Sequence, residues 1–223
     1  MITFVIVHYN TPILTTCLCS SIAKFHKDYK IVLFDNSDKF PFENRELFNV
    51  TYIDNTKNQL IDFDKELSEV PNLLKETSII NSNHGSFKHT RSIQWVFDNM
   101  KLENFILLDS DILLKENCED IIDENVCASG KLGIDRLEPF LLYINLKKCK
   151  KESVNFFDVK RMIYVSSLEP KTDTGGVFLE NIKTKNLPFN IIDTNKKMIH
   201  LASASWNKVN YKKWLFDNQN LWK

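Results

Sequence analysis

The chain has 223 residues, a length that suits one domain, and its 29 acidic and 29 basic side chains give a formal net charge of zero. A neutral chain argues against a protein that coats nucleic acid, so we expect no nucleic-acid partner. The five cysteines show no C-x-x-C spacing, which argues against a disulfide framework or a zinc site and favours a reducing compartment.

The start of the chain shows no sign of a signal peptide, because no basic region precedes the apolar run at residues 2–7. No apolar run approaches the roughly 20 residues that a membrane span needs. We therefore expect a cytoplasmic protein, attached at most to the inner face of a membrane.

The N-terminal segments predict a strand–helix–strand unit. Residues 2–8 are rich in Ile, Val and Phe and predict a buried strand. A helix is expected from Pro12 to about Lys24 with Thr11 as its N-cap, and residues 30–35 predict a second buried strand. A unit of this kind places its two strands parallel.

The next fifty residues carry weaker signals. A short strand is expected at 50–53, a helix or a surface excursion over the polar residues 54–76, and another short strand at 78–81. The segment that follows has an i, i+3, i+4, i+7 apolar stripe, which predicts an amphipathic helix around Ile93, Val96, Phe97 and Met100.

Two aspartates one residue apart interrupt a long apolar run. Phe105–Leu108 predicts a buried strand, and Asp109 and Asp111 follow it, where open α/β sheets bind ligands. Two carboxylates at that place suit Mg²⁺ or Mn²⁺, and the alternative is a turn in which both bond backbone amides. The other D-x-D triplet, Asp62–Asp64, has no strand before it, and we interpret it as a chance occurrence on a solvated helix face.

The second half begins with two further predicted strands, at 125–129 and 140–144. Basic residues gather between 147 and 161, which indicates either a solvated face or attraction to an anionic lipid surface.

The last third of the chain holds three candidate features. Asp173 and Thr174 precede two adjacent glycines and a helix start that either residue could cap. A short strand is expected at 196–200 and ends in His200, whose imidazole is either a metal ligand or a structural side chain. The aromatic and basic tail at 205–223 is expected to pack on the domain, on a partner subunit or on a membrane surface.

Three segments in this order resemble the family-2 glycosyltransferases, which have the GT-A fold. They are the first strand with Tyr9 and Asn10, the segment Leu33–Ser37 and the D-x-D strand Leu107–Asp111. The resemblance covers residues 1–115 well and only scattered pieces beyond them. It implies a single α/β domain at 1–204, with a mostly parallel central sheet flanked by helices, and a C-terminal extension at 205–223.

The resemblance implies an activity as well as a fold. The expected reaction is a metal-dependent, inverting transfer of a sugar from a nucleotide-sugar donor to a saccharide or lipid-linked acceptor, as in surface polysaccharide synthesis. The residues it places at the donor are Tyr9, Asn10, Asp35, Asn36, His84, His89, Asp109 and Ser110. Many relatives have an Asn-x-Gly pattern where this chain has His84 and His89, and His84 has a capping or turn role as its alternative.

The remaining implied roles concern the metal and the proton. Asp109, Asp111 and His200 would bind Mn²⁺ or Mg²⁺. Asp173 would be the base that takes the proton from the acceptor hydroxyl, with Glu138 in reserve. As a structural alternative, Asp173 is only a helix cap.

Two rival functions use the same residues differently. A nucleotidyltransferase would need a Gly-rich opening loop with Arg and Lys, and this chain lacks it. A non-catalytic nucleotide- or glycan-binding module would keep the fold without the metal, and it would use Asp173 only as a cap.

Overall fold

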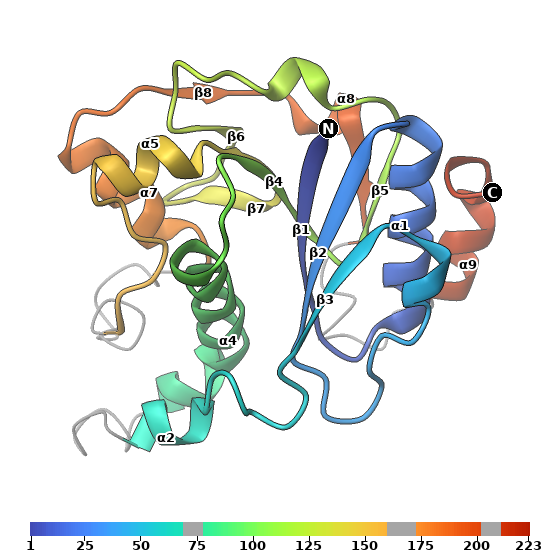
Figure 1. The fold of residues 1–223 in the computed structure, drawn as a ribbon, viewed down its shortest axis with the longest axis horizontal. Coiled ribbons are helices and arrows are strands. Elements are labelled where there is room, and N and C mark those ends of the chain that lie inside the picture. Colours follow the sequence, from blue (N-terminus) through green and yellow to red (C-terminus); the bar gives the residue numbers. More distant parts are fainter. Residues whose placement is uncertain (69–77, 160–172, 202–210) are drawn as a thin grey trace.

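The computed structural model describes residues 1–68, 78–159, 173–201 and 211–223, and for residues 78–84 it describes the backbone only. One seven-stranded sheet forms its centre, in the order β3-β2-β1-β4-β7-β6-β8, and a two-stranded sheet pairs β5 with β9. Figure 1 shows the helices on both sides of the larger sheet. No helix within the described ranges is long and apolar enough to cross a membrane.

The first half of the sheet is parallel. Strand β1 (Ile2–His8) lies between β2 (Tyr29–Asp35) and β4 (Phe105–Asp109), and β3 (Val50–Asp54) follows β2 at the edge. Helix α1 (Pro12–Phe25) connects β1 to β2, so the predicted strand–helix–strand unit is confirmed. In the described part of the polar segment after β3, Phe63–Ser68 form the short helix α2.

One local prediction in this half is confirmed and one is wrong. Thr11 is the N-cap residue of α1, although its side chain makes no capping bond and its Oγ1 lies 3.1 Å from Ser110 Oγ. Residues 78–81 do not form a strand but begin the long helix α4 (Ser78–Asn99). A short apolar pair such as Ile79 and Ile80 fits either structure, and only the longer apolar stripe after it reports the helix.

The second half of the sheet is mixed. Strand β7 (Leu137–Ile144) runs antiparallel to β4, β6 (Ala128–Leu132) runs antiparallel to β7, and β8 (Phe189–Ile191) closes this edge parallel to β6. The predicted strands at 125–129 and 140–144 therefore exist with shifted ends. The short helix α5 (Leu146–Lys151) follows β7 and carries the first of the clustered lysines.

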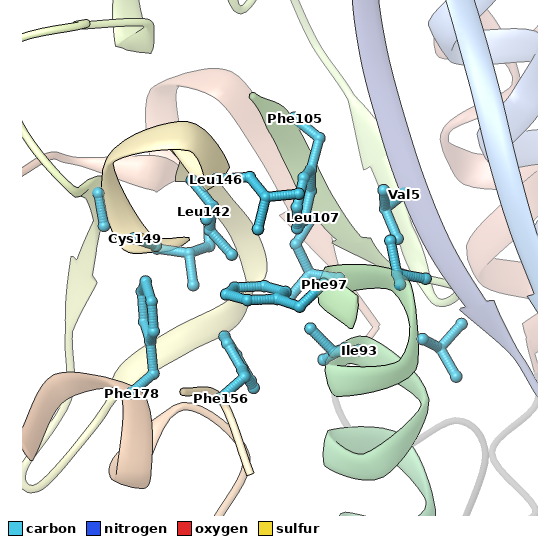
Figure 2. Close-up of a cluster of buried hydrophobic side chains, with 14 of the residues drawn as sticks. Val5, Ile93, Phe97, Phe105, Leu107, Leu142, Leu146, Cys149, Phe156 and Phe178 are labelled. Carbon is cyan, nitrogen blue, oxygen red and sulfur yellow. The ribbon is translucent and has the colours of Figure 1, made fainter. Parts of the chain in front are cut away.

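Alternate residues of β1 belong to different cores, as expected for a strand buried on both faces. Phe4 and Ile6 pack with α1, whereas Val5 and Val7 pack with α4, α5 and α7 (Gly176–Thr184). Figure 2 shows the second of these clusters around Phe97.

Phe97 is central to that cluster, because its ring meets three other aromatic rings at 5.8–6.2 Å, those of Phe105, Phe156 and Phe178. Truncating such a fully packed ring typically costs about 3–5 kcal/mol of stability. The well-packed cluster supports α4 and β4, the two elements that lead into the D-x-D segment.

The smaller sheet joins distant parts of the chain. Strand β5 (Ile112–Leu114) follows the D-x-D segment, and β9 (Met198–His200) follows the one-turn helix α8 (Thr194–Lys197). The tail forms α9 (Tyr211–Asp217) and a 3-10 turn at Gln219–Leu221. Further 3-10 turns lie at Arg45–Leu47, before β3, and at Glu119–Ile121, after β5. In Figure 1 the tail lies beside α1.

Candidate active site

A cavity of about 440 Å³ opens at the carboxyl ends of β1 and β4. Since these two parallel strands are neighbours, with Val7 paired to Asp109, the residues that follow them meet at one edge of the sheet. The middle of α4, the start of β7, the turn before α7 and the end of β9 complete the lining. Two groups of charged and hydrogen-bonding side chains line this space.

The first group, which we call the metal wall, consists of Asp109, Asp111 and His200. Asp109 ends β4, Asp111 directly precedes β5, and His200 ends β9. Strand pairing of Ile112 with His200 brings the imidazole close, so that Nε2 lies 3.2 Å from Asp111 Oδ1. One ligand atom from each of the three residues lies within 4.8 Å of the other two.

The carboxylate of Asp109 is the least satisfied group in this wall. Its Oδ1 is buried and accepts no hydrogen bond from the described residues. Burial and the neighbouring charge of Asp111 raise the pKa of the Asp109 carboxyl. A cation between the two carboxylates would relieve both effects.

The donor set fits a divalent metal ion. Two carboxylate oxygens and one imidazole nitrogen converge, and one buried oxygen lacks a hydrogen-bond donor. Carboxylates suit hard cations such as Mg²⁺ and Mn²⁺, and the imidazole makes the set less suited to Mg²⁺, which takes oxygen ligands. The pKa of His200 is raised, because the bond to Asp111 and the charges of both aspartates outweigh the effect of burial.

His89 extends the metal wall from α4. Its Nε2 lies 3.4 Å from Asp109 Oδ1, and burial lowers the pKa of the imidazole to about 4. The ring therefore stays neutral at physiological pH and can donate or accept a hydrogen bond. His84 lies five residues earlier in α4, and its side chain is outside the described part of the structure.

The second group, which we call the arginine wall, consists of Ser86, Arg136, Glu138 and Asp173. Arg136 Nε donates to Glu138 Oε2 at 2.9 Å, and its Nη1 donates to Asp173 Oδ2. Ser86 Oγ donates to Asp173 Oδ1 at 2.5 Å. One guanidinium therefore bonds two carboxylates within the wall itself.

Glycines shape the backbone of the arginine wall. Gly175 has φ +90° and acts as the N-cap of α7, and a Cβ there would lie 2.0 Å from the carbonyl oxygen of Leu137. A Cβ at Gly133 would lie 2.6 Å from Glu138 Oε1. The predicted capping of α7 by Asp173 or Thr174 is wrong, since Gly175 is the cap and Asp173 Oδ1 accepts from the neighbouring Thr174 N.

Some of the residues after β1 and β2 line the cavity, and others hold the loop after β2 in place. Tyr9 lines the cavity with 40% of its surface exposed, and Asn36 lines it while bonding Ser92 and Asn55. Asn10 has φ +53°, and its Oδ1 accepts from two backbone amides in the loop after β2. It shapes this loop and does not line the cavity.

Asp35 is also not brought into the cavity. Its carboxylate is fully buried and accepts from the amides of Ser37 and Phe42 and from the hydroxyl of Tyr52, each at 2.8 Å. The structure thus shows Asp35 holding the loop after β2, and its predicted place at the donor stays a prediction. Ser110 does line the cavity, beside Thr11.

Sequence reasoning missed Ser86 and Arg136 as site residues. Arg136 and Glu138 are two positions apart at the start of a strand, so their shared side was readable from the alternation of strand side chains. Ser86 offered no such signal, because its bond to Asp173 spans 87 residues and depends on how α4 packs against the turn before α7.

Comparisons with known proteins support the fold. Neither a protein-family model nor a curated protein sequence matches this chain. A solved structure of the glycosyltransferase GlyE from Streptococcus pneumoniae TIGR4 matches 99% of this chain and 51% of its own, with 12% identity and a TM-score of 0.53. The chain thus spans about half the length of that protein.

Two further solved structures agree. An active-site mutant of LgtC matches 86% of this chain and 73% of its own, with 11% identity and a TM-score of 0.51. The bifunctional glycosyltransferase WbbM matches 86% of this chain and 39% of its own, with 10% identity and a TM-score of 0.50. The predicted GT-A fold is thereby confirmed, whereas membership of family 2 is not.

Proposed function

We propose that this chain is a metal-dependent glycosyltransferase that uses a nucleoside-diphosphate sugar as its donor. The observation that carries the proposal is the metal wall, whose ligand atoms converge within 4.8 Å at the ligand-binding edge of a GT-A sheet. That GlyE and WbbM are glycosyltransferases supports the same class of activity.

The metal wall would serve the leaving group. Asp109, Asp111 and His200 would hold the ion, with Mn²⁺ preferred to Mg²⁺ because of the imidazole. A bound ion of this kind neutralises charge that develops on a departing diphosphate. His89 would remain a neutral hydrogen-bonding group beside Asp109.

The donor would enter along the ends of β1 and β2. The exposed ring of Tyr9 can stack on a base or a sugar, and Asn36 and Ser110 lie on the same lining. In this proposal Asn10 and Asp35 act by shaping the loop after β2.

The arginine wall would serve the acceptor. We assign the base to Asp173, which takes the proton from an acceptor hydroxyl as that oxygen bonds the anomeric carbon and the nucleoside diphosphate leaves, with inversion. Asp173 Oδ1 already accepts from Ser86 and from the amide of Thr174, whereas Oδ2 accepts from Arg136 alone among the described residues, so the acceptor hydroxyl would donate to the second lone pair of Oδ2. Glu138, held by the same Arg136, is the reserve base.

The acceptor class rests on the sequence resemblance. We propose a saccharide or lipid-linked saccharide of surface polysaccharide synthesis. Contact with the inner face of a membrane and formation of a homodimer stay predictions.

The decisive experiment measures binding before turnover. Calorimetry should detect nucleoside diphosphates in the presence of Mn²⁺ but not in EDTA, and hydrolysis of a panel of nucleotide sugars should then identify the donor. Asp111→Asn should lower the Mn²⁺-dependent affinity by at least about tenfold. Asp64→Asn, an exposed aspartate of the other D-x-D triplet, is the matched control and should change nothing.

The results separate the rival functions. If Mn²⁺ has no effect on nucleotide binding, the metal-dependent mechanism fails. If nucleotides bind but no nucleotide sugar is consumed with any saccharide or with water, the chain is a binding module.

A further inference from the structure

Two of the three metal-wall residues depend on a very short ribbon. Strands β5 and β9 have three residues each, and they pair Ile112 with His200, Leu113 with Ile199 and Leu114 with Met198. A backbone bond of 3.0 Å from Leu201 N to Asp111 O extends this pairing to the metal end. The register of the ribbon therefore sets the distance between Asp111 and His200.

A ribbon of this length needs support on both faces, because an isolated two-stranded pair is at best marginally stable in water. A slip by one residue would exchange its two faces and move His200 along β5 by about 3.3 Å. At that distance the imidazole and the Asp111 carboxylate no longer share one ion.

The inner face of the ribbon belongs to the main core. Ile112, Leu114 and Met198 are buried in the cluster that also holds α1 residues such as Leu18. At the end away from the cavity, Lys197 Nζ lies 2.6 Å from Asp120 Oδ1 and 3.0 Å from Glu116 Oε1.

The outer face of the ribbon is covered by the tail. Leu113 is fully buried in a separate cluster with Leu14 and Cys17 of α1 and Leu215 of α9. The partly buried members of this cluster include Ile199 of β9 and four residues of the tail, namely Tyr211, Trp214, Leu221 and Trp222. Lys24 Nζ also donates to the carbonyl oxygen of Asn220 at 2.5 Å.

We propose that the C-terminal segment 211–223 is a positioning element of the metal site: by packing on Leu113 and Ile199, it holds Asp111 and His200 in register. Docking of the segment and binding of the metal are then coupled, and each strengthens the other by the same factor. This inference rests on the metal site of the proposed function.

The first test compares two buried leucines in the full-length chain. Leu215→Ala should weaken Mn²⁺ binding by about tenfold, measured by electron paramagnetic resonance of free Mn²⁺. Leu146→Ala, in the cluster on the opposite side of the main sheet, should change the affinity by less than about twofold. Leu215→Met, which nearly conserves volume, should restore it.

The second test uses the unmodified chain and so does not depend on whether a variant folds. Mn²⁺ should slow amide hydrogen exchange in residues 211–223, because it favours the docked segment. If Leu215→Ala binds Mn²⁺ as tightly as the unmodified chain, or if bound Mn²⁺ leaves exchange in the segment unchanged, the positioning role is overturned and the metal site stands. If the unmodified chain binds no Mn²⁺, both proposals are overturned.

Discussion

The metal wall and the arginine wall of the cavity each contain a pair of carboxylates, but the groups that bond the two pairs differ. Each wall places two carboxylates close together in a partly buried site. In the arginine wall a guanidinium from the chain itself bonds both carboxylates, Glu138 and Asp173. In the metal wall imidazoles lie beside the carboxylates of Asp109 and Asp111, and Asp109 Oδ1 accepts no hydrogen bond from the described residues.

The difference indicates which of the two carboxylate pairs needs a bound cation. A carboxylate pair that shares a guanidinium is held in place by hydrogen bonds without a ligand, whereas a pair with a buried oxygen that accepts no hydrogen bond from the described residues is costly until a cation binds. Substitutions in the metal wall should therefore change the response to metal ions. Substitutions in the arginine wall should change the stability of the metal-free protein.

The largest effect should come from breaking the backbone of the arginine wall. Gly175→Ala adds a Cβ that would lie 2.0 Å from the Leu137 carbonyl oxygen, at a φ of +90° that side chains rarely adopt. We expect a loss of about 3 kcal/mol or more in the free energy of unfolding, measured with urea.

The same substitution at Gly133 is the comparison. Its Cβ would meet the far end of the flexible Glu138 side chain, so Gly133→Ala should cost less than Gly175→Ala. Equal losses at the two positions would show that strain at the Leu137 contact is not the cause.

The next effect concerns the metal wall. Saturating Mn²⁺ at 100 times its dissociation constant should stabilise the unmodified protein by about 2.7 kcal/mol, seen as a higher melting temperature. Asp109→Asn should remove this response. Without metal, however, the same variant should be as stable as the unmodified protein or more so, because it removes a buried charge next to Asp111.

The matched change in the arginine wall should have the opposite sign. Asp173→Asn leaves Arg136 with one carboxylate instead of two, so we expect the metal-free protein to lose about 1 kcal/mol, a modest value because these side chains are partly exposed. Its stabilisation by Mn²⁺ should persist. If Asp109→Asn and Asp173→Asn shift the metal-free melting temperature in the same direction, the contrast between the walls is wrong.

The smallest effect is a pH dependence of the free energy of unfolding that comes from His26, a residue outside both walls. It must be subtracted when the stabilities of wall variants are compared at different pH. Burial lowers the pKa of His26 below its ordinary 6.5, although Glu119 opposes the shift. The unfolded chain therefore binds a proton first as pH falls, so the stability present above about pH 6.5 is lost progressively as pH falls below it. His26→Gln should flatten this slope by less than about 1 kcal/mol, measured by unfolding at pH 5 and pH 8.

Sequence patterns predicted the parallel half of the fold well. The apolar runs at 2–8, 30–35 and 105–108 all became buried strands of the main sheet, because such runs bury both faces of a strand whatever surrounds them. They failed at 78–81, where the apolar pair was too short to distinguish a strand from a helix.

The candidate site was predictable in part for the same reason. Asp109 and Asp111 could be placed at the sheet edge, since a strand of known direction leads directly into them. Asp35 ends β2 in the same way, yet its carboxylate accepts hydrogen bonds from Ser37, Phe42 and Tyr52. The position of a residue on a strand does not reveal which hydrogen bonds its side chain will make.

By itself, then, the sequence determined the strands of the parallel half, their order of appearance and the placement of two aspartates at a ligand-binding edge, because these follow from hydrophobic patterns within a few residues. Only the tertiary structure decided which charged side chains contact one another. The bond between Asp111 and His200 spans 89 residues, and the bond between Arg136 and Asp173 spans 37. Such pairs depend on the register of a three-residue ribbon and on one close glycine contact, and neither leaves a local pattern in the chain.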